Sequence, residues 1–206
     1  ISNFNDDTEK LFNDEVQNVI SNNPGGIILD LRNDPGGYLE TAIEVASEWV
    51  EDGVIVTEKY SEENKIEHLA RGRARLSNFP TVVLVNQGSA SASEIVSGAL
   101  QDDNKAVLIG KKTFGKGSVQ TLQQLPDGSS LKITVAKWLT PKGRSINDEG
   151  IMPDINIDLT EAYYSGNKDP QQDKAIEILK GKTFDVVKIR LENATTTPSA
   201  STTPNK

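Results

Sequence analysis

The sequence predicts an α/β fold, and two observations lead to that prediction. First, a short apolar strand, a glycine-bearing turn and a helix follow one another twice, over residues 27–50 and 81–101. Second, both strands, residues 27–31 and 81–85, are nearly continuous apolar runs, which is typical of strands covered on both faces of a sheet. Alternating strands and helices favour a sheet built from such units.

The other elements follow in order along the chain. Apolar residues at helical spacing predict helices over residues 6–21 and 38–50, and a further helix is expected over about 92–101. Residues 54–60 and 65–69 form one predicted hairpin, and residues 121–125 and 130–139 form another. A third buried strand is expected over 106–109, a short helix over 173–180 and a last strand over 185–191.

Composition limits the function classes. Lys and Arg number 22 against 30 Asp and Glu, a net charge of −8, which argues against nucleic-acid binding. The basic segment 71–75 is therefore interpreted as a solvated loop or a partner of the protein's own acidic groups. The absence of cysteine excludes disulfides and thiolate chemistry, and the single histidine, His68, is interpreted as a surface residue. We expect no metal and no other cofactor.

The length of 206 residues suits one domain, which we assign to residues 1–192. Residues 193–206 are rich in Thr, Pro and Ser and are expected to form a disordered tail. No apolar run is long enough to span a bilayer, and no signal peptide is visible. The chain begins without methionine, so we expect it to be a piece of a longer protein.

The two strand-to-helix turns are the natural place for a site, because ligands of α/β sheets bind beyond the carboxyl ends of the strands. The first turn ends in Pro-Gly-Gly, where Gly37 could present its N–H group to a developing oxyanion. The second turn carries Ser91, and Glu94 follows three residues later. This pair fits a helix capping box, but a helix N-terminus also favours a serine that attacks a carbonyl. The pattern alone leaves both interpretations open.

The loop over residues 110–117 is a near miss to a phosphate-binding loop. Gly117 stands where the Ser or Thr of that loop would be, and the following residues resemble a strand, so we expect no nucleotide. Without a second histidine, a serine nucleophile would need another base. A neutral lysine can serve, so a Ser-Lys pair is the variant that the residues allow.

Several motifs, in the same order, resemble the carboxyl-terminal processing peptidases of serine protease family S41. They are LDLRNDPGG at 29–37, SASASEI at 89–95, KTFGKGSVQ at 112–120, WLTPKGR at 138–144 and GIMPD at 150–154. The resemblance extends over roughly residues 7–185. It implies a fold related to the ClpP/crotonase group and endoproteolysis near the C-termini of unfolded or tagged proteins.

The same resemblance implies roles for five residues. Ser91 would be the nucleophile and Lys116 the general base, at the family's usual separation. Gln120 would orient the lysine. The N–H groups of Ala92 and Gly37 would form the oxyanion hole.

The resemblance also bears on partners and location. Protein or peptide substrates would bind near their C-termini, and self-association into a homo-oligomer is left open. The family implies a periplasmic, secreted or membrane-associated extracytoplasmic protein, with a PDZ domain that this chain lacks. Two alternatives are a crotonase-like acyl-CoA enzyme and a protease-like binding module without catalysis.

Overall fold

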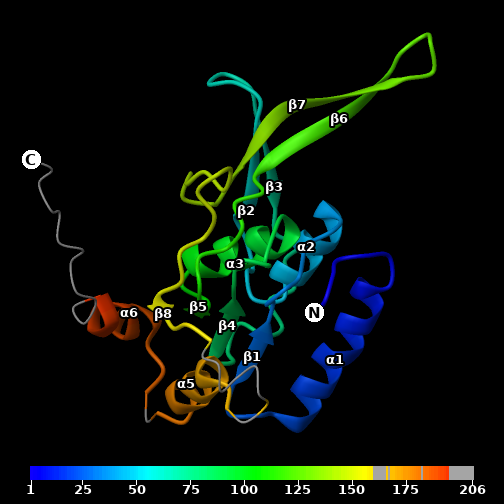
Figure 1. Cartoon of the computed structure of the whole chain (residues 1–206). Coiled ribbons are helices and arrows are strands. Elements are labelled where there is room, and N and C mark those ends of the chain that lie inside the picture. Colours follow the sequence, from blue (N-terminus) through cyan, green and yellow to red (C-terminus); the bar gives the residue numbers. More distant parts are fainter. Residues whose placement is uncertain (160–165, 167, 182, 195–206) are drawn as a thin grey trace, which may run out of the picture.

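The computed structural model describes residues 1–159, 166, 168–181 and 183–194, which form two four-stranded sheets and surrounding helices (Figure 1). The parallel sheet has the order β1 (Ile27–Asp30), β4 (Thr81–Val85), β5 (Val107–Gly110), β8 (Ile155–Asn156). The antiparallel sheet has the order β3 (Lys65–Leu69), β2 (Val54–Lys59), β7 (Ser130–Leu139), β6 (Ser118–Gln124). The helices are α1 (Thr8–Asn22), α2 (Leu39–Ala46), α3 (Ala92–Asp102), α5 (Pro170–Leu179) and α6 (Val186–Ala194).

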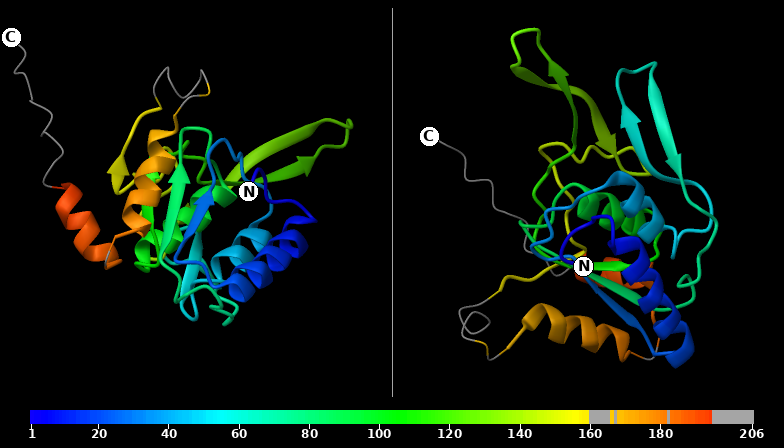
Figure 2. Two further views of the ribbon diagram at one scale, coloured as in Figure 1. Left: turned by 90° about the horizontal axis from the view of Figure 1, so that it is seen from below. Right: turned by 90° about the vertical axis from the view of Figure 1, so that its right-hand side faces the viewer.

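The parallel sheet is covered on both faces, as its apolar runs predict. Val83 and Val85 of β4 belong to a buried cluster that includes side chains of α2 and α3. Val82 and Leu84 belong to a second cluster with side chains of α5 and α6. Because side chains alternate along a strand, the two clusters lie on opposite faces, and Figure 2 shows helices on both sides of this sheet. The predicted α/β class is therefore confirmed.

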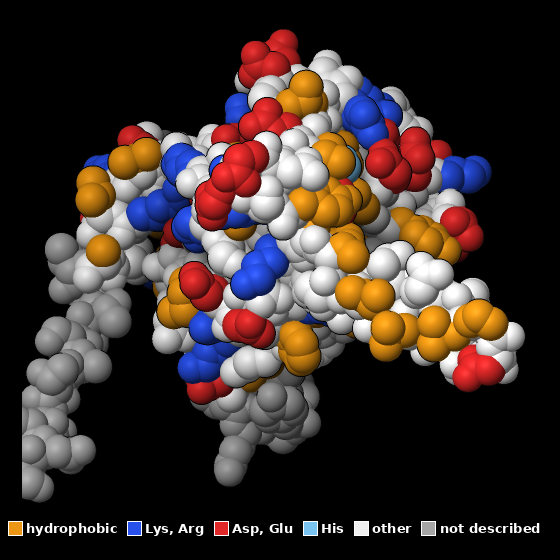
Figure 3. All heavy atoms as spheres, turned by 90° about the horizontal axis from the view of Figure 1, so that it is seen from above, with side chains coloured by type: hydrophobic (Ala, Val, Ile, Leu, Met, Phe, Trp, Pro, Cys, Tyr) orange, Lys and Arg blue, Asp and Glu red, His pale blue; other side chains and the backbone are white. Residues whose placement is uncertain are grey.

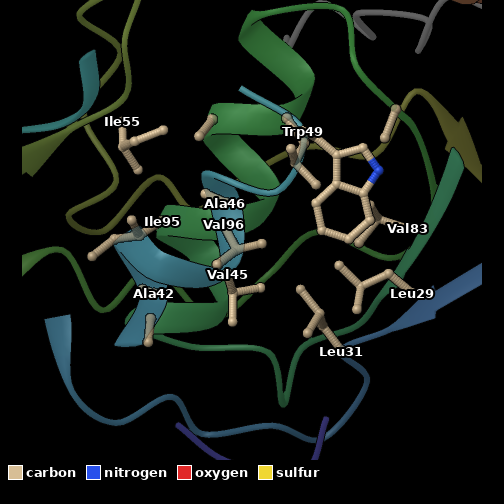
Figure 4. Packing of buried hydrophobic residues seen from close by; sticks show 14 of the residues in the cluster. Leu29, Leu31, Ala42, Val45, Ala46, Trp49, Ile55, Val83, Ile95 and Val96 are labelled. Carbon is tan, nitrogen blue, oxygen red and sulfur yellow. The ribbon is translucent and has the colours of Figure 1, made fainter. Parts of the chain in front are cut away.

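Trp49, just after α2, joins three elements of the first cluster. The indole is buried, its Nε1–H donates to Thr81 Oγ1 at 2.8 Å, and its ring centroid lies 6.1 Å from that of Phe12 in α1. Figure 4 shows the ring beside Leu29 and Val83 of the sheet. Close packing of this kind fixes α2 on the sheet, and with it the turn between β1 and α2.

The antiparallel sheet extends away from the body as two hairpins, β2–β3 and β6–β7 (Figure 1). Both predicted hairpins are therefore confirmed. The β6–β7 hairpin is the longer one and displays a row of apolar side chains (Figure 3). The exposed ones are Leu122, Leu125, Leu131, Ile133 and Val135. The three from β7 are two residues apart and share one face of the hairpin.

The basic segment 71–75 pairs with the protein's own acidic groups, which confirms one of its two interpretations. Its three arginines form ion pairs with Glu40, Glu44 and Glu48, which follow one another at one-turn spacing along α2 and its end. Glu48 is nearly fully buried, so two arginines compensate its charge. The segment fastens the loop before β4 to α2.

Helix α5 begins three residues before the predicted start, at Pro170. The Asp169 side chain accepts hydrogen bonds from the backbone N–H groups of the first turn, which makes it the N-cap. Arg32 Nη1 donates to the same carboxylate at 2.8 Å, and Arg32 also binds Asp30 at the end of β1. This long-range contact sets the helix start.

The predicted last strand, residues 185–191, is wrong, because these residues begin α6. The β-branched residues here favour a strand by propensity. However, Asp185 Oδ1 accepts the N–H of Lys188 at 3.0 Å, as an N-cap does. Val186 and Ile189, three residues apart, both pack on the second cluster. A helix thus buries these side chains against β5, and this burial outweighs the preference of β-branched residues for strands.

The predicted tail begins inside this helix. Asn193 and Ala194 are helical, so α6 extends two residues past the predicted boundary at residue 192. The rest of the predicted tail, 195–206, lies outside the described residues. No helix in the described part of the chain is long and apolar enough to cross a membrane.

Candidate active site

The two strand-to-helix turns of the parallel sheet lie in direct contact. The first joins β1 to α2 and holds Gly36 and Gly37, and the second joins β4 to α3 and holds Ser91. Gly36 has φ 93°, and a Cβ atom there would lie 2.8 Å from both Ser91 Cβ and Ala92 N. Only glycine allows so close an approach. The predicted oxyanion turn and the predicted nucleophile are therefore brought together.

Hydrogen bonds hold the two turns in this arrangement. The carbonyl of Asp34 accepts the N–H of Ala90 at 2.9 Å and the Ser93 hydroxyl at 3.0 Å. The Ser89 hydroxyl donates to a carbonyl just after β1 at 2.7 Å. Ser89 and Ser93 are fully buried, whereas Ser91 is half-buried. Of the three serines, the middle one is thus the accessible hydroxyl.

Ser91 has a strained backbone. It is the N-cap of α3, with φ 55° and ψ −113°. Holding a non-glycine residue at positive φ costs on the order of 1–3 kcal/mol and occurs mostly where function requires it. A serine on a sharp, strained turn between a strand and a helix presents its hydroxyl at the sheet's end. This geometry goes beyond what a plain helix cap needs.

The buried Glu94 carboxylate joins the Ser91 turn to the loop between β5 and β6. Its Oε2 accepts the N–H of Ser91 at 2.8 Å and the N–H of Lys116 at 2.9 Å. Its Oε1 accepts the Thr113 hydroxyl at 2.5 Å and the N–H of Gly115 at 2.6 Å. One carboxylate with four donors is strongly stabilised despite full burial. It fixes the backbones of the predicted nucleophile and base close together.

This role of Glu94 was missed from the sequence. The capping-box pattern predicts the contact with Ser91, which is present. The three contacts with residues 113–116 come from a segment about twenty residues further along, and no local pattern indicates them. A glutamate three residues after the predicted nucleophile, in a predicted helix that is otherwise mostly small and apolar, is the one sequence signal that could have raised the question.

Both predicted oxyanion donors have a free N–H group. Within the described residues, the N–H groups of Gly37 and Ala92 donate to no protein acceptor. Ala92 is the first residue of α3, where backbone donors have no partner inside the helix. Gly37 has φ 154°, and its Cβ position is occupied by the Phe4 carbonyl. Glycine is therefore required there, at the point where the chain turns into α2.

Asp34 is a fully buried acid beside these donors. Its Oδ1 accepts the N–H of Gly36 at 2.8 Å, whereas its Oδ2 has no partner within the part of the chain that the structure describes. Burial raises the pKa of the Asp34 carboxyl, and the hydrogen bond from Gly36 opposes that shift. The turn thus holds an incompletely satisfied carboxyl at the edge of the site.

The side chains of Lys116, the predicted base, and of Gln120 are less constrained than the turn that holds Ser91. Lys116 is exposed, and among the described residues its Nζ has no hydrogen-bond or ion-pair partner, Ser91 and Gln120 included. Gln120 lies on β6 and is exposed, with its Nε2 at 3.5 Å from Thr134 Oγ1 on β7. The backbone of Lys116 is in place next to the Ser91 turn, but the Ser91–Lys116 side-chain contact is not formed in this structure.

His68 lies away from the site but is not a simple surface residue. It sits on β3, its side chain is only 20% exposed, and its Nε2 lies 3.4 Å from Glu58. Its ring packs edge-on against Trp138. The predicted surface position is therefore corrected, because hairpin pairing with β2 places the ring over its neighbours. Among the described residues, no group of three or more His, Cys, Asp or Glu side chains could hold a metal ion.

Comparison with known proteins identifies the family. The model of peptidase family S41 matches residues 1–157. A carboxyl-terminal-processing protease of Synechocystis is 44% identical over 159 residues, which cover 76% of this chain and 37% of that protein. A "Probable CtpA-like serine protease" of Staphylococcus aureus is 43% identical over 172 residues, 82% of this chain and 34% of that protein. The chain thus spans about a third of the length of these curated relatives.

A solved structure agrees with the sequence matches. The photosystem II D1 C-terminal processing protease superposes with a TM-score of 0.75 at 32% identity, over 90% of this chain and 47% of that one. The motifs, the family model and the fold all indicate the same family. The chain belongs to peptidase family S41 and is similar to that family's carboxyl-terminal processing proteases.

Proposed function

We propose that this chain carries the catalytic centre of a serine endopeptidase of the C-terminal processing type, with a Ser91–Lys116 dyad. One observation supports the proposal above others. The buried Glu94 carboxylate binds the backbone N–H groups of both residues through one oxygen, so the two share a single anchor. A helix cap alone would need the contact of Glu94 with Ser91 but not its contact with Lys116.

In the proposed reaction, neutral Lys116 Nζ takes the proton from Ser91 Oγ as that oxygen attacks the substrate carbonyl. The N–H groups of Gly37 and Ala92 stabilise the negative oxygen of the tetrahedral intermediate. Lys116 then gives its proton to the leaving amine, which leaves an acyl-enzyme on Ser91. Water, activated by the same lysine, hydrolyses the ester and releases the acid product.

The lysine must reach Ser91 and lose its proton for this step. The Lys116 side chain has freedom to turn, because it is exposed and unpaired among the described residues. Substrate bound over the site removes water from Nζ, which favours the neutral amine. Gln120, on β6 four residues later, orients the amine in the proposal. No metal, nucleotide or other cofactor takes part, so EDTA leaves the rate unchanged.

The substrates in this proposal are unfolded or C-terminally tagged proteins, cleaved near their C-termini. The names of the Synechocystis and photosystem II relatives support that choice. The enzyme works outside the cytoplasm, as a periplasmic, secreted or membrane-associated protein. Residues 1–192 form the catalytic core, and its parallel sheet with paired N–H groups at two turns supports a relation to the ClpP/crotonase group.

The test is cleavage of an unfolded polypeptide by the parent chain and by Ser91→Ala. We expect the variant to lose about 10⁴-fold in rate, because the nucleophile is gone. Ser93→Ala is the matched control: it removes a buried hydrogen bond to the Asp34 carbonyl and costs about 1 kcal/mol of stability, but keeps most of the activity. Equal cleavage by Ser91→Ala and parent would refute the proposal. No cleavage by the parent chain would favour a binding module.

A further inference from the structure

The GIMPD motif at residues 150–154 takes no part in the proposed reaction, yet it lies against the loop that carries Lys116. The N–H of Thr113, in that loop, donates to the Ile151 carbonyl at 3.1 Å, and the N–H of Ile151 donates to Thr113 Oγ1 at 2.7 Å. Gly150 has φ 60°, and a Cβ atom there would lie 2.7 Å from the Thr113 carbonyl oxygen. Only glycine allows this approach. The motif therefore braces the loop at Thr113.

The Thr113 hydroxyl is buried, and its two hydrogen bonds fix the direction in which it donates. A backbone N–H can only donate, so the hydroxyl oxygen accepts from Ile151. The hydroxyl proton is then directed to Glu94 Oε1, at 2.5 Å. A hydroxyl that accepts one hydrogen bond becomes a stronger donor in the next, which strengthens its bond to the carboxylate. A valine at this position would keep the shape of the side chain and lose both bonds.

Thr113 differs from the other groups that hold Glu94. Among the contacts of the described residues, it is the only side chain that donates to this carboxylate. The other three donors are the backbone N–H groups of Ser91, Gly115 and Lys116. Two of these belong to the residues that the carboxylate itself positions. The Thr113 hydroxyl is fixed by the GIMPD motif instead, so it gives the carboxylate a reference outside the dyad.

We propose that Thr113 is a positioning residue of the catalytic centre. Its hydroxyl orients the Glu94 carboxylate, and the carboxylate sets the backbone of Ser91 relative to that of Lys116. The GIMPD motif acts on the site through this hydroxyl. Proton transfer requires the two side chains to come within hydrogen-bond reach, so a small shift of either backbone lowers the rate. The inference rests on the proposed function, because it explains how the proposed dyad is held.

The test uses two substitutions that separate the hydroxyl of Thr113 from the shape of its side chain. Thr113→Val removes the hydroxyl, so we expect kcat on fluorescein-labelled casein to fall about 30-fold, with KM within about twofold of the parent value. Thr113→Ser keeps the hydroxyl and should retain kcat within about threefold of the parent value. Rates are measured at a temperature at which circular dichroism shows every variant to be folded.

Thr140→Val is the matched control. Thr140 is also buried, its hydroxyl accepts the N–H of Arg144 at 3.3 Å, and its methyl group lies next to Gly98 in the second half of α3. This variant should lose stability but keep the kcat of the parent. A parent kcat in Thr113→Val would overturn the inference. Equal losses of kcat in Thr113→Val and Thr113→Ser, or in Thr113→Val and Thr140→Val, would also overturn it.

Amide hydrogen exchange tests the same inference without catalysis. The N–H groups of Ser91 and Lys116 both donate to Glu94, so Thr113→Val should speed their exchange about tenfold. The N–H of Leu108 donates to the Asp154 carboxylate and should exchange as in the parent. Thr140→Val controls for a general loss of stability.

An unchanged exchange rate at Lys116 in Thr113→Val would overturn the inference, whether or not the chain cleaves casein. A parent chain that cleaves nothing would refute the proposed function instead. The two failures are therefore distinguishable.

Discussion

The two members of the proposed dyad are held in different ways. Ser91 is half-buried on a strained turn that packs against Gly36, whereas the Lys116 side chain is exposed and its Nζ has no partner among the described residues. Their backbones, however, share the Glu94 carboxylate. The fold thus holds the proposed nucleophile on a rigid turn, but it holds the proposed base only at its backbone. The Ser91–Lys116 contact depends on the exposed lysine side chain.

The largest effect is expected when Lys116, the proposed base, is replaced. Lys116→Ala and Lys116→Arg should both lower the cleavage rate by roughly 10²–10⁴-fold, because neither provides a neutral amine at working pH. Initial rates on an unfolded substrate measure the loss. His68→Ala is the control and keeps the parent rate, since its ring contacts Trp138 and Glu58 on the hairpin sheet. A loss of activity in His68→Ala with Lys116→Ala unaffected would reverse the assignment.

The shared anchor can be tested next. Glu94→Gln replaces one acceptor oxygen by an amide that faces N–H donors, so it should lower the free energy of unfolding by about 2–3 kcal/mol. The same change should displace Ser91 or Lys116. This displacement should lower the cleavage rate about 100-fold under conditions where the variant is folded.

Glu67→Gln on exposed β3 is the matched control for both measurements and should behave as the parent does. Urea unfolding and initial rates separate the two effects. Full activity in a destabilised Glu94→Gln would show that the carboxylate holds the fold but does not position the dyad.

A smaller effect, on the pH dependence of stability, is expected from Asp34 in the turn between β1 and α2. Burial raises the pKa of Asp34 in the folded protein, so the folded state keeps a proton that the unfolded chain releases at about pH 4. As pH rises from there through the raised pKa, the stability of the parent should fall relative to Asp34→Asn, which does not titrate. Above the raised pKa the difference should be constant. Urea unfolding of both proteins between pH 4 and 8 measures it, and parallel curves over the whole range would contradict the account.

The sequence predicts the parts of the site that depend on local pattern. The apolar runs at 27–31 and 81–85 place both turns at one sheet end, and Ser91 directly before a helix follows from the capping pattern. The four-donor arrangement at Glu94 could not be predicted, because three donors come from residues 113–116. Contacts between distant segments leave no periodic trace in either segment.

The same inability to detect contacts between distant segments explains the errors in the predicted fold. Residues 185–191 are rich in β-branched side chains, but the Asp185 cap and packing on the face of β5 opposite α3 favour a helix. His68 looks exposed in a charged segment until β3 pairs with β2 and places it against Trp138. In both places tertiary packing overrides local propensity.

The Ser91–Lys116 dyad is tested most directly by its chemistry with a serine-reactive fluorophosphonate. The parent chain and Lys116→Ala are labelled under the same conditions, and the modified residue is identified by mass spectrometry. We expect the label on Ser91 in the parent chain and almost no label in Lys116→Ala. Labelling of Ser91 at the same rate in Lys116→Ala would show that the lysine is not the base.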